Sequence, residues 1–236
     1  MRTKVIKSKF IEHHLSFLRQ KDLSCSSFQK HSNQIFSHLG QELYNFLPIT
    51  TKKIETPLTE MEANFVDSNN ILLVAVLRSA FPMCQGIQKS LDKSTLAVID
   101  IKRNETTAQP HLNYDGIPKN LSKYNRIVIP DPMLATGGSA CMTIDILKKR
   151  GAKNIIYLSL ISAEKGINCI NQQHPDVEVI VCAMDPSLNQ QSYIVPGLGD
   201  FGDRYFTNQT LHIPDTINNT TLIYQPNGQF TVQSNS

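Results

Sequence analysis

The sequence predicts an α/β fold in which a mostly parallel, twisted sheet is flanked by helices. A series of short, nearly continuous apolar runs is typical of strands that are covered on both faces. Helically spaced apolar residues lie between most of these runs, as expected for βαβ units. The length of 236 residues, with 40% hydrophobic and 18% charged residues, suits one sizeable globular domain with room for an appendage.

The elements before the sheet are a helix and a β-arm. Apolar residues recur at helical spacing in residues 26–47, which predicts a helix. Residues 49–66 alternate around Pro57 and predict extended segments that form the arm. His13 and His14 precede an apolar stripe, and we interpret them as surface or cap residues rather than metal ligands.

The sheet itself follows in five strands with helices between most of them. The strands are predicted at Ile71–Leu77, Ser94–Ile101, Arg126–Ile129, Asn154–Ile161 and Val177–Met184. The helices are predicted at residues 82–91, 139–150 and 163–173. The stretch 102–125 is polar and contains Pro110 and Pro118, which predicts a flexible excursion.

The chain changes character after Gln209, where Asn, Thr, Gln and Ser dominate. Thr221–Val232 carries alternating β-formers around Asn227-Gly228, a dipeptide suited to a tight turn with positive φ. A β-hairpin and a disordered polar tail both remain open here. We therefore divide the chain into a domain at residues 1–208 and an extension at residues 209–236.

Charge and hydropathy argue against several classes of protein. The net charge of +3 is not concentrated in any block, and the N-terminal basic residues Arg2, Lys4, Lys7 and Lys9 alternate with apolar ones. We expect a solvated surface there and no nucleic-acid partner. No apolar run suggests a secretory signal or a membrane span, so we expect a cytoplasmic protein. The five cysteines are expected to be buried structural thiols in a reducing compartment: Cys25, Cys84, Cys141, Cys169 and Cys182.

One loop carries the strongest chemical signal. Ile127–Ile129 predicts a strand, and Ala140, Ile144 and Leu147 form the apolar stripe of the helix that follows. Thr136–Ser139 therefore lies at a helix N-terminus, at the carboxyl edge of the sheet, where open α/β folds bind ligands. The free N–H groups of the helix and its dipole favour a phosphate, and the glycines allow close approach. Asp131, just upstream, suits ribose hydroxyls or a hydrated metal, so the segment predicts a sugar-phosphate site. A plain turn capped by Ser139 would explain the glycines but not the acid.

Two common nucleotide motifs do not apply. The loop lacks Gly-Lys-Ser/Thr, so it is not a Walker A loop. Gly197–Gly202 matches GxGxxG in its letters, but Pro196 precedes it, and we expect neither a helix nor a βαβ unit after it.

"DPMLATGGS" (Asp131–Ser139) resembles the phosphoribosyl-pyrophosphate (PRPP) loop of the uracil phosphoribosyltransferases. "YIVPGLGDFGDRYF" (Tyr193–Phe206) resembles the C-terminal uracil-binding segment of that family. "VLRSAFPM" (Val76–Met83) is similar to its pyrophosphate loop, and "KRNET" (Lys102–Thr106) to its second PRPP-binding arginine segment. The similarity runs in order over roughly residues 3–207 and implies the type I phosphoribosyltransferase fold.

The resemblance implies that PRPP and uracil give UMP and pyrophosphate, a reaction of pyrimidine salvage. Asp131 and Arg78 are the implied catalytic residues, with Asp131 on the ribose hydroxyls and Arg78 and Arg103 on the pyrophosphate. The implied PRPP-binding set is Arg78, Arg103, Asp131, Pro132, Met133, Leu134, Ala135, Thr136, Gly137, Gly138, Ser139 and Asp200. The implied uracil-binding set, which acts mostly through the backbone, is Ile194, Gly199, Asp200 and Phe201. No residue is clearly a general base.

The implied cofactor is Mg²⁺ held by PRPP without a direct protein ligand, with GTP as a candidate activator. The implied assembly is a homodimer or homotetramer. Ser79-Ala80 replaces the family's usual Ala-Gly, and Phe201 replaces a small residue that is frequent beside the base. Three alternatives stay open: a regulator of this fold that binds RNA, a degenerate nucleotide-binding module, and a phosphoribosyltransferase for another base.

Overall fold

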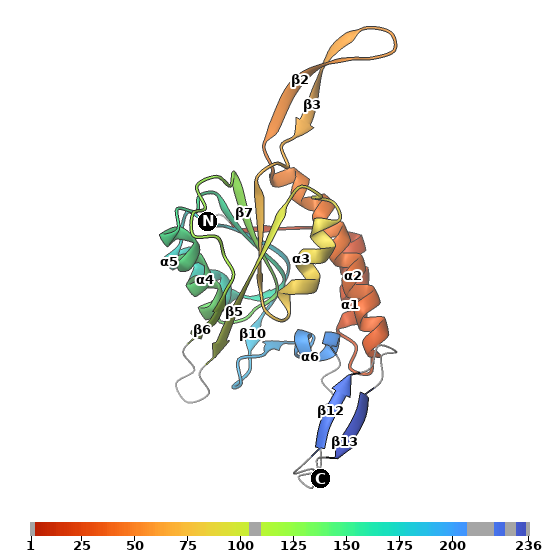
Figure 1. Ribbon diagram of the computed structural model, residues 1–236, viewed down its shortest axis with the longest axis vertical. Coiled ribbons are helices and arrows are strands. Elements are labelled where there is room, and N and C mark those ends of the chain that lie inside the picture. Colours follow the sequence, from red (N-terminus) through yellow and green to blue (C-terminus); the bar gives the residue numbers. More distant parts are fainter. Residues whose placement is uncertain (1–2, 104–109, 207–219, 225–229, 235–236) are drawn as a thin grey trace. The chain divides into compact units, whose positions relative to one another are not determined.

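The computed structural model describes residues 3–103, 110–206, 220–224 and 230–234. The chain forms two units, Met1–Phe206 and Thr207–Ser236. The first unit is built on a seven-stranded sheet (Figure 1). Its strands are β1 (Thr3–Val5), β4 (Ile71–Val76), β5 (Thr95–Arg103), β6 (Pro110–Asp115), β7 (Arg126–Leu134), β8 (Ile155–Ala163) and β9 (Glu178–Asp185), in the spatial order β1-β9-β8-β7-β4-β5-β6.

Helices cover both faces of the sheet. One face carries α1 (Lys9–Leu18), α2 (Cys25–Glu42) and α3 (Ala80–Gln88), and the other carries α4 (Gly138–Lys149) and α5 (Glu164–Gln173) (Figure 1). A 3₁₀ turn, η1 (Leu43–Phe46), follows α2. Every residue of β4 and of β8 is buried, which explains why these strands read as continuous apolar runs. The predicted fold class is confirmed.

The β-arm is also present. β2 (Ile49–Glu55) and β3 (Glu60–Val66) pair antiparallel along their whole length, and Figure 1 shows them projecting away from the sheet. Thr56 closes the turn, because its hydroxyl accepts the N–H of Thr59 and donates to the carbonyl of the same residue. Most of the arm is exposed, including Leu58 at its tip.

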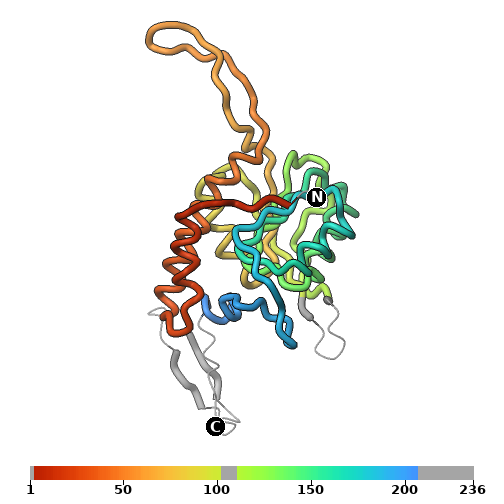
Figure 2. Tube along the Cα trace, turned by 180° about the vertical axis from the view of Figure 1, so that it is seen from behind, coloured from red at the N-terminus to blue at the C-terminus, as the bar shows by residue number. Residues whose placement is uncertain are grey.

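Two N-terminal elements were not predicted from the sequence. β1 runs parallel to β9 at the edge of the sheet, where Figure 2 shows the N-terminal segment in red reaching the cyan strands. The following α1 was not predicted, and it contains His13 and His14. Its N-cap is Ser8, whose hydroxyl accepts the N–H of Ile11, so the two histidines are surface residues but not caps.

The stretch 102–125 is not simply a flexible excursion. β6 pairs antiparallel with β5 from Ile99↔Asp115 to Arg103↔Pro110, while residues 104–109 lie outside the described part. Pro110 does not prevent a strand from forming here. It is instead the first residue of the edge strand β6, a position where proline is tolerated.

The order of the strands creates a crevice between β4 and β7. From β4 the chain crosses to β5 on one side, whereas from β7 it moves to β8 and then β9 on the other side. The crossovers therefore diverge at β4 and β7, which are direct neighbours. In open α/β sheets, such a divergence point at the carboxyl ends of the strands is where ligands bind.

The second unit contains β12 (Thr220–Tyr224) and β13 (Phe230–Ser234), which pair antiparallel from Thr220↔Ser234 to Tyr224↔Phe230. This pairing is what the hairpin alternative requires, although the Asn227-Gly228 turn lies outside the described residues. The division at residue 208 stays a prediction. Within the described ranges, no helix has the length and apolar character needed to cross a membrane.

Candidate active site

A hollow of about 450 Å³ lies at the carboxyl ends of β4 and β7. Its walls come from five segments distant in sequence: the end of β4 and the turn after it, Ile101 of β5, the end of β7 with the loop that enters α4, Tyr157 of β8, and the segment around β11 (Ile194–Val195). Most sequence-predicted site residues line it together: Arg78, Asp131, Met133, Leu134, Ala135, Thr136, Gly137, Gly138, Ser139, Ile194, Gly199, Asp200 and Phe201.

Two of the predicted residues stand apart. Pro132 is buried within β7 and is not among the residues that line the hollow. Arg103 is the last residue of β5, and its side chain lies outside the part of the chain that the structure describes.

The loop after β7 turns directly into α4. Gly137 is the N-cap residue of α4 and has a φ of +85°, a left-handed conformation that favours glycine. Its carbonyl accepts the N–H of Cys141 at 2.9 Å, which starts the helical hydrogen-bond series. The alternative of a turn capped by Ser139 was wrong, because the N-cap position of α4 is held by Gly137, and Ser139 lies inside the helix. The first turn of α4, Gly138–Ala140, lines the hollow, and the N–H groups of a first helical turn suit an anion.

Asp131 lies at the floor of the hollow, on β7. One carboxylate oxygen accepts the phenolic O–H of Tyr157 at 2.7 Å, and the other accepts the N–H of Met133 at 3.1 Å. Tyr157 comes from the neighbouring strand β8 and is almost fully buried. Burial raises the pKa of Asp131 to about 6, although the hydrogen bonds from Tyr157 and Met133 oppose that increase. The carboxylate is thus held in one orientation and is ionised at neutral pH.

Arg78 follows β4 directly and reaches the opposite wall of the hollow. Its guanidinium donates to the carboxylate of Asp203 at 3.2 Å, and both side chains are more than half exposed. The guanidinium also lies 5.6 Å from the ring centroid of Phe206. Ser79 has a φ of −60°, and Ala80 begins α3, so the substitution of the usual Ala-Gly meets no left-handed backbone here.

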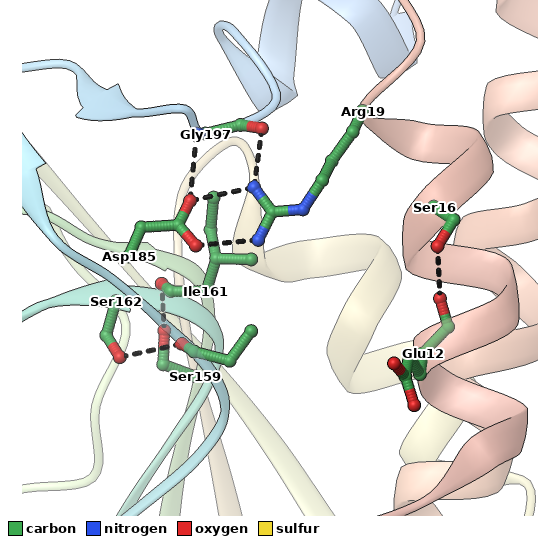
Figure 3. A network of polar contacts seen from close by, with 9 residues as sticks. Glu12, Ser16, Arg19, Ser159, Ile161, Ser162, Asp185 and Gly197 are labelled. Atoms are coloured by element: carbon green, nitrogen blue, oxygen red, sulfur yellow. Dashed lines mark hydrogen bonds and ion pairs between the residues drawn. The ribbon is translucent and has the colours of Figure 1, made fainter.

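The wall opposite the loop after β7 is the segment 194–206, and hydrogen bonds of Arg19 and Arg204 hold it against the rest of the domain. The guanidinium of Arg19 forms two hydrogen bonds of 2.7 Å to the carboxylate of Asp185 and a third of 2.8 Å to the carbonyl of Gly197 (Figure 3). The N–H of Gly197 donates back to Asp185 at 2.8 Å. Gly197 has a φ of +61°, and a Cβ there would lie 2.0 Å from the carbonyl oxygen of Ile194, so no larger residue fits this turn.

Arg204 makes the second tie. Its guanidinium donates to the carbonyls of Leu18, Leu198 and Gln20 and lies 4.4 Å from the ring centroid of Phe28. The short helix α6 (Phe201–Phe206) begins next to Asp200, whose carboxylate accepts the N–H of Asp203 at 2.8 Å. A helix does therefore follow the GxGxxG letters, contrary to expectation. No βαβ unit does, because β11 pairs antiparallel with β10 (Ser187–Leu188).

The ring of Phe201 is directed into the core rather than into the hollow. Phe201 is 1% exposed, and its ring packs against Phe28, Phe36 and Tyr205 with centroid separations of 5.3, 5.7 and 5.5 Å. The aromatic side chain therefore anchors α6 on α2, and the main chain of this residue is the part left to face a ligand.

Tyr157, Arg19 and Asp185 were not predicted as residues of the site. Asp185 ends β9 at the same edge of the sheet as the loop after β7, so its position in the strand was a usable signal. Arg19 lies 166 residues before Asp185, at the C-cap of a helix that was not predicted, and nothing in the local pattern pointed to it.

Comparisons with known proteins point to one family. Residues 5–208 match the family model described as uracil phosphoribosyltransferase. The chain is 39% identical over 202 residues to the uracil phosphoribosyltransferases of Levilactobacillus brevis and Streptococcus pneumoniae, a match that covers 86% of this chain and 96% of each relative. Among solved structures, it is similar to the AQ2163 protein from Aquifex aeolicus, with a TM-score of 0.78, 29% identity and coverage of 87% of this chain and 98% of that one. The adenine phosphoribosyltransferase of Trypanosoma brucei shares the fold at a TM-score of 0.52, with 10% identity and coverage of 81% of this chain and 87% of that one.

The family model spans nearly the whole first unit, and the relatives match over almost their full length. The match includes both the phosphate loop after β7 and the segment 194–206 that face each other across the hollow. The chain therefore belongs to the uracil phosphoribosyltransferase family.

Proposed function

We propose that this protein transfers the 5-phosphoribosyl group from PRPP to uracil, giving UMP and pyrophosphate in pyrimidine salvage. The observation that supports this most directly is the hollow at the divergence of β4 and β7. It joins a helix N-terminus with a glycine at its N-cap, an oriented carboxylate and an arginine on one side with a glycine-rich main-chain segment on the other.

The phosphate side of the hollow suits PRPP. The loop Thr136–Ser139 binds the 5-phosphate through the N–H groups of α4, with Met133, Leu134 and Ala135 shaping the approach and Pro132 holding the strand behind it. Asp131 accepts hydrogen bonds from the ribose hydroxyls and opposes the positive charge that develops at C1. Arg78 and Arg103 bind the pyrophosphate, since a planar guanidinium matches phosphate oxygens in pairs.

The opposite wall suits uracil. The base presents an acceptor, a donor and an acceptor along O4, N3–H and O2, and alternating main-chain N–H and C=O groups of Ile194, Gly199 and Phe201 match that order. Cytosine would leave polar groups unpaired at about 1–3 kcal/mol each in a dry site. The burial of the Phe201 ring among other aromatic rings supports this assignment, because the side chain does not fill the space that a base needs.

The reaction forms the bond between uracil N1 and C1 and breaks the bond between C1 and the pyrophosphate oxygen. Pyrophosphate leaves with the electron pair of that bond, stabilised by the arginines, and the N1 proton passes to solvent. Holding uracil and PRPP in line supplies much of the acceleration. No residue is assigned as a general base.

The carboxylates of Asp131 and Asp200 line the hollow, and hard oxygen donors suit a hydrated magnesium ion that arrives with PRPP. Within the described residues, no group of three or more His, Cys, Asp or Glu side chains could hold a metal ion. We propose that PRPP oxygens and water are the ligands of the ion. When bound, Mg²⁺ neutralises charge on the departing pyrophosphate. A homodimer or homotetramer and activation by GTP remain proposals, as does a cytoplasmic location.

A base panel tests the proposal. PRPP consumption and pyrophosphate release are measured with uracil, cytosine and hypoxanthine at saturating Mg²⁺. Turnover with uracil far above the other two bases is expected. Preference for hypoxanthine or cytosine would indicate a phosphoribosyltransferase for another base, and saturable PRPP binding without turnover would indicate a degenerate binding module.

A further inference from the structure

Two cysteine thiols meet behind the phosphate loop. The Sγ atoms of Cys141, in the first turn of α4, and of Cys169, in α5, are 3.3 Å apart. A disulfide has a sulfur–sulfur distance of about 2.05 Å, so bonding requires the two sulfurs, which belong to two packed helices, to approach by roughly 1.2 Å. The two residues are 28 positions apart, and no cysteine spacing in the sequence pointed to this pair.

Both cysteines also contact Gly137, the N-cap residue of α4. The N–H of Cys141 donates to the carbonyl of Gly137. On the other side, a Cβ added to Gly137 would lie 2.7 Å from the Cβ of Cys169 and 3.1 Å from its Sγ. The phosphate loop is thus packed directly on the Cys169 side chain, and no space remains between them. A displacement of either thiol is therefore expected to displace the loop.

The two thiols differ in access. Cys169 is half-buried and lines a second hollow of about 950 Å³, whose wall includes Thr136 of the phosphate loop. The amide of Gln173 donates to its sulfur at 3.4 Å. Cys141 is only 4% exposed, and burial, together with the contact to Cys169, raises its pKa to about 12. An oxidant therefore reaches Cys169 first, and Cys141 is the second thiol.

We propose that Cys141 and Cys169 form a reversible disulfide under peroxide, and that this bond weakens PRPP binding by shifting the phosphate loop. Hydrogen peroxide oxidises the Cys169 thiol to a sulfenic acid and releases one water. The sulfur of Cys141 then attacks the sulfur of Cys169, the S–S bond forms, and the sulfenic hydroxyl leaves as a second water with the proton of Cys141. The proximity of the two sulfurs offsets the low thiolate content of Cys141.

The inference rests on the proposed role of Thr136–Ser139 as the 5-phosphate loop. Closure of the sulfur–sulfur gap pulls Cys169 away from Gly137 or draws the first turn of α4 toward α5. Either movement alters the direction of the N–H groups that hold the phosphate. We expect the KM for PRPP to rise about tenfold, within the roughly 10²-fold loss that a misplacement of about 1 Å can cause.

The test uses the full-length, fully reduced protein treated with hydrogen peroxide. Alkylation in denaturant, followed by mass spectrometry, counts the remaining thiols, and peptide mapping locates the bond. The five alkylated cysteines should fall to three, with a single link between Cys141 and Cys169. The KM for PRPP should rise in the linked protein and return to its original value after dithiothreitol.

Matched variants separate this pair from the other thiols. Cys169→Ser should retain the PRPP affinity of the reduced protein and lose the response to peroxide. Cys141→Ser should stop at a sulfenic acid on Cys169, which dimedone traps. Cys182→Ser, which alters a half-buried cysteine on β9, should respond like the unmodified protein. Failure of the reduced protein to bind PRPP would overturn the proposed function itself. A link between other cysteines, or a Cys141–Cys169 link with an unchanged KM, would overturn the inference alone.

Discussion

The two walls of the hollow are built in different ways. The proposed phosphate side follows from the central sheet: Asp131 lies within β7, its partner Tyr157 lies on the adjacent β8, and the loop enters α4 at once. The proposed uracil side, residues 194–206, contains only the two-residue β11 and the short α6 as regular structure. The guanidinium of Arg19, at the end of α1, holds this segment at Gly197, and the guanidinium of Arg204, in the segment's own helix α6, donates to the carbonyls of Leu18 and Gln20. Buried sheet register thus fixes one wall, whereas a few polar side chains fix the other.

This difference has an energetic consequence. The wall formed by the sheet is stabilised by the whole hydrophobic core. A single substitution there is therefore expected to change the reaction rate more than the position of the wall. The other wall, residues 194–206, is called the tied wall below, because its position depends on the ion pair of Arg19 and Asp185. Asp185 is only 5% exposed. Burial alone would raise the pKa of Asp185, but the hydrogen bonds from Arg19 and from the N–H of Gly197 outweigh it and hold the pKa below its usual range. Removal of Arg19 therefore leaves a buried charge without its partner.

Arg78→Ala has the largest expected effect, and it acts on the phosphate side. We expect kcat/KM for PRPP to fall by about 10²- to 10³-fold, the loss typical of removing one donor to developing negative charge. The melting temperature should change little, since the side chain is more than half exposed. Steady-state kinetics and calorimetric titration with PRPP measure the effect. Asp203→Ala is the matched control, because it removes the ion-pair partner and leaves the arginine, and it should retain most of the activity. Equal losses in the two variants would mean that Arg78 acts through Asp203.

Arg19→Met tests the tied wall. It should lower the free energy of unfolding by about 3–5 kcal/mol, as expected for a buried ion pair that loses one member. The KM for uracil should rise more than the KM for PRPP, because Gly197 loses its contact as well. The loss in unfolding free energy, measured in urea, should shrink as the pH falls. It shrinks first where Asp185 of the variant is protonated, since burial raises its pKa once Arg19 is gone, and again below about 3.9, where the unmodified protein loses the stabilisation of its ionised Asp185.

Two companion variants sharpen this test. Arg19→Lys keeps the charge but not the paired hydrogen bonds. Its free energy of unfolding should lie between that of the unmodified protein and that of Arg19→Met. Lys4→Met removes an ion pair with Glu178 in which the lysine is exposed, and it should cost about 0–1 kcal/mol. If Lys4→Met and Arg19→Met destabilise the protein equally, the contrast between an exposed pair and the tied wall is wrong.

Tyr157→Phe should have a small effect that depends on pH. The pKa of Asp131 is about 6 with the Tyr157 hydrogen bond in place, and loss of this bond removes an interaction that opposes the rise caused by burial. The acid limb of kcat/KM against pH should move upward by up to about one unit, since a hydrogen bond contributes about 0.5–1.5 kcal/mol. Activity above pH 8 should change little. An unshifted limb would show that Asp131 does not control it.

Asp131→Asn is the reference for the profile of kcat/KM against pH, because it has no carboxylate to titrate. The direction in which it changes the stability also follows from the raised pKa of Asp131. Because the pKa of Asp131 in the folded protein lies above the unfolded value of about 3.9, its contribution to stability is present at low pH and is lost as the pH rises through about 6. The asparagine variant should therefore gain stability relative to the unmodified protein between pH 4 and pH 7, while its activity is low throughout.

The sequence predicted the sheet well because buried parallel strands are continuously apolar, as in β4 and β8. It also predicted the passage from β7 through the glycines into α4, since strand, glycines and helix are contiguous there, and the phosphate-binding role of this loop stays a proposal. It missed β6, an edge strand that begins at Pro110, and β1, which is only three residues long. It could not find Arg19, Tyr157 or the Cys141–Cys169 pair, because those contacts join segments far apart in the chain and exist only after the sheet has formed.

Recognition of uracil by the main chain is the central claim for the tied wall, and Phe201→Ala tests it most directly. The measurement is the ratio of kcat/KM for uracil to that for cytosine in both forms. Loss of the buried ring should loosen α6 and raise the KM for uracil, because truncating a core Phe to Ala typically costs about 3–5 kcal/mol. The ratio should nevertheless still favour uracil strongly, because the donors and acceptors belong to the backbone. A variant that gains activity on uracil from an inactive parent, or that switches its preference to cytosine, would show that the Phe201 side chain controls the base and would contradict the account.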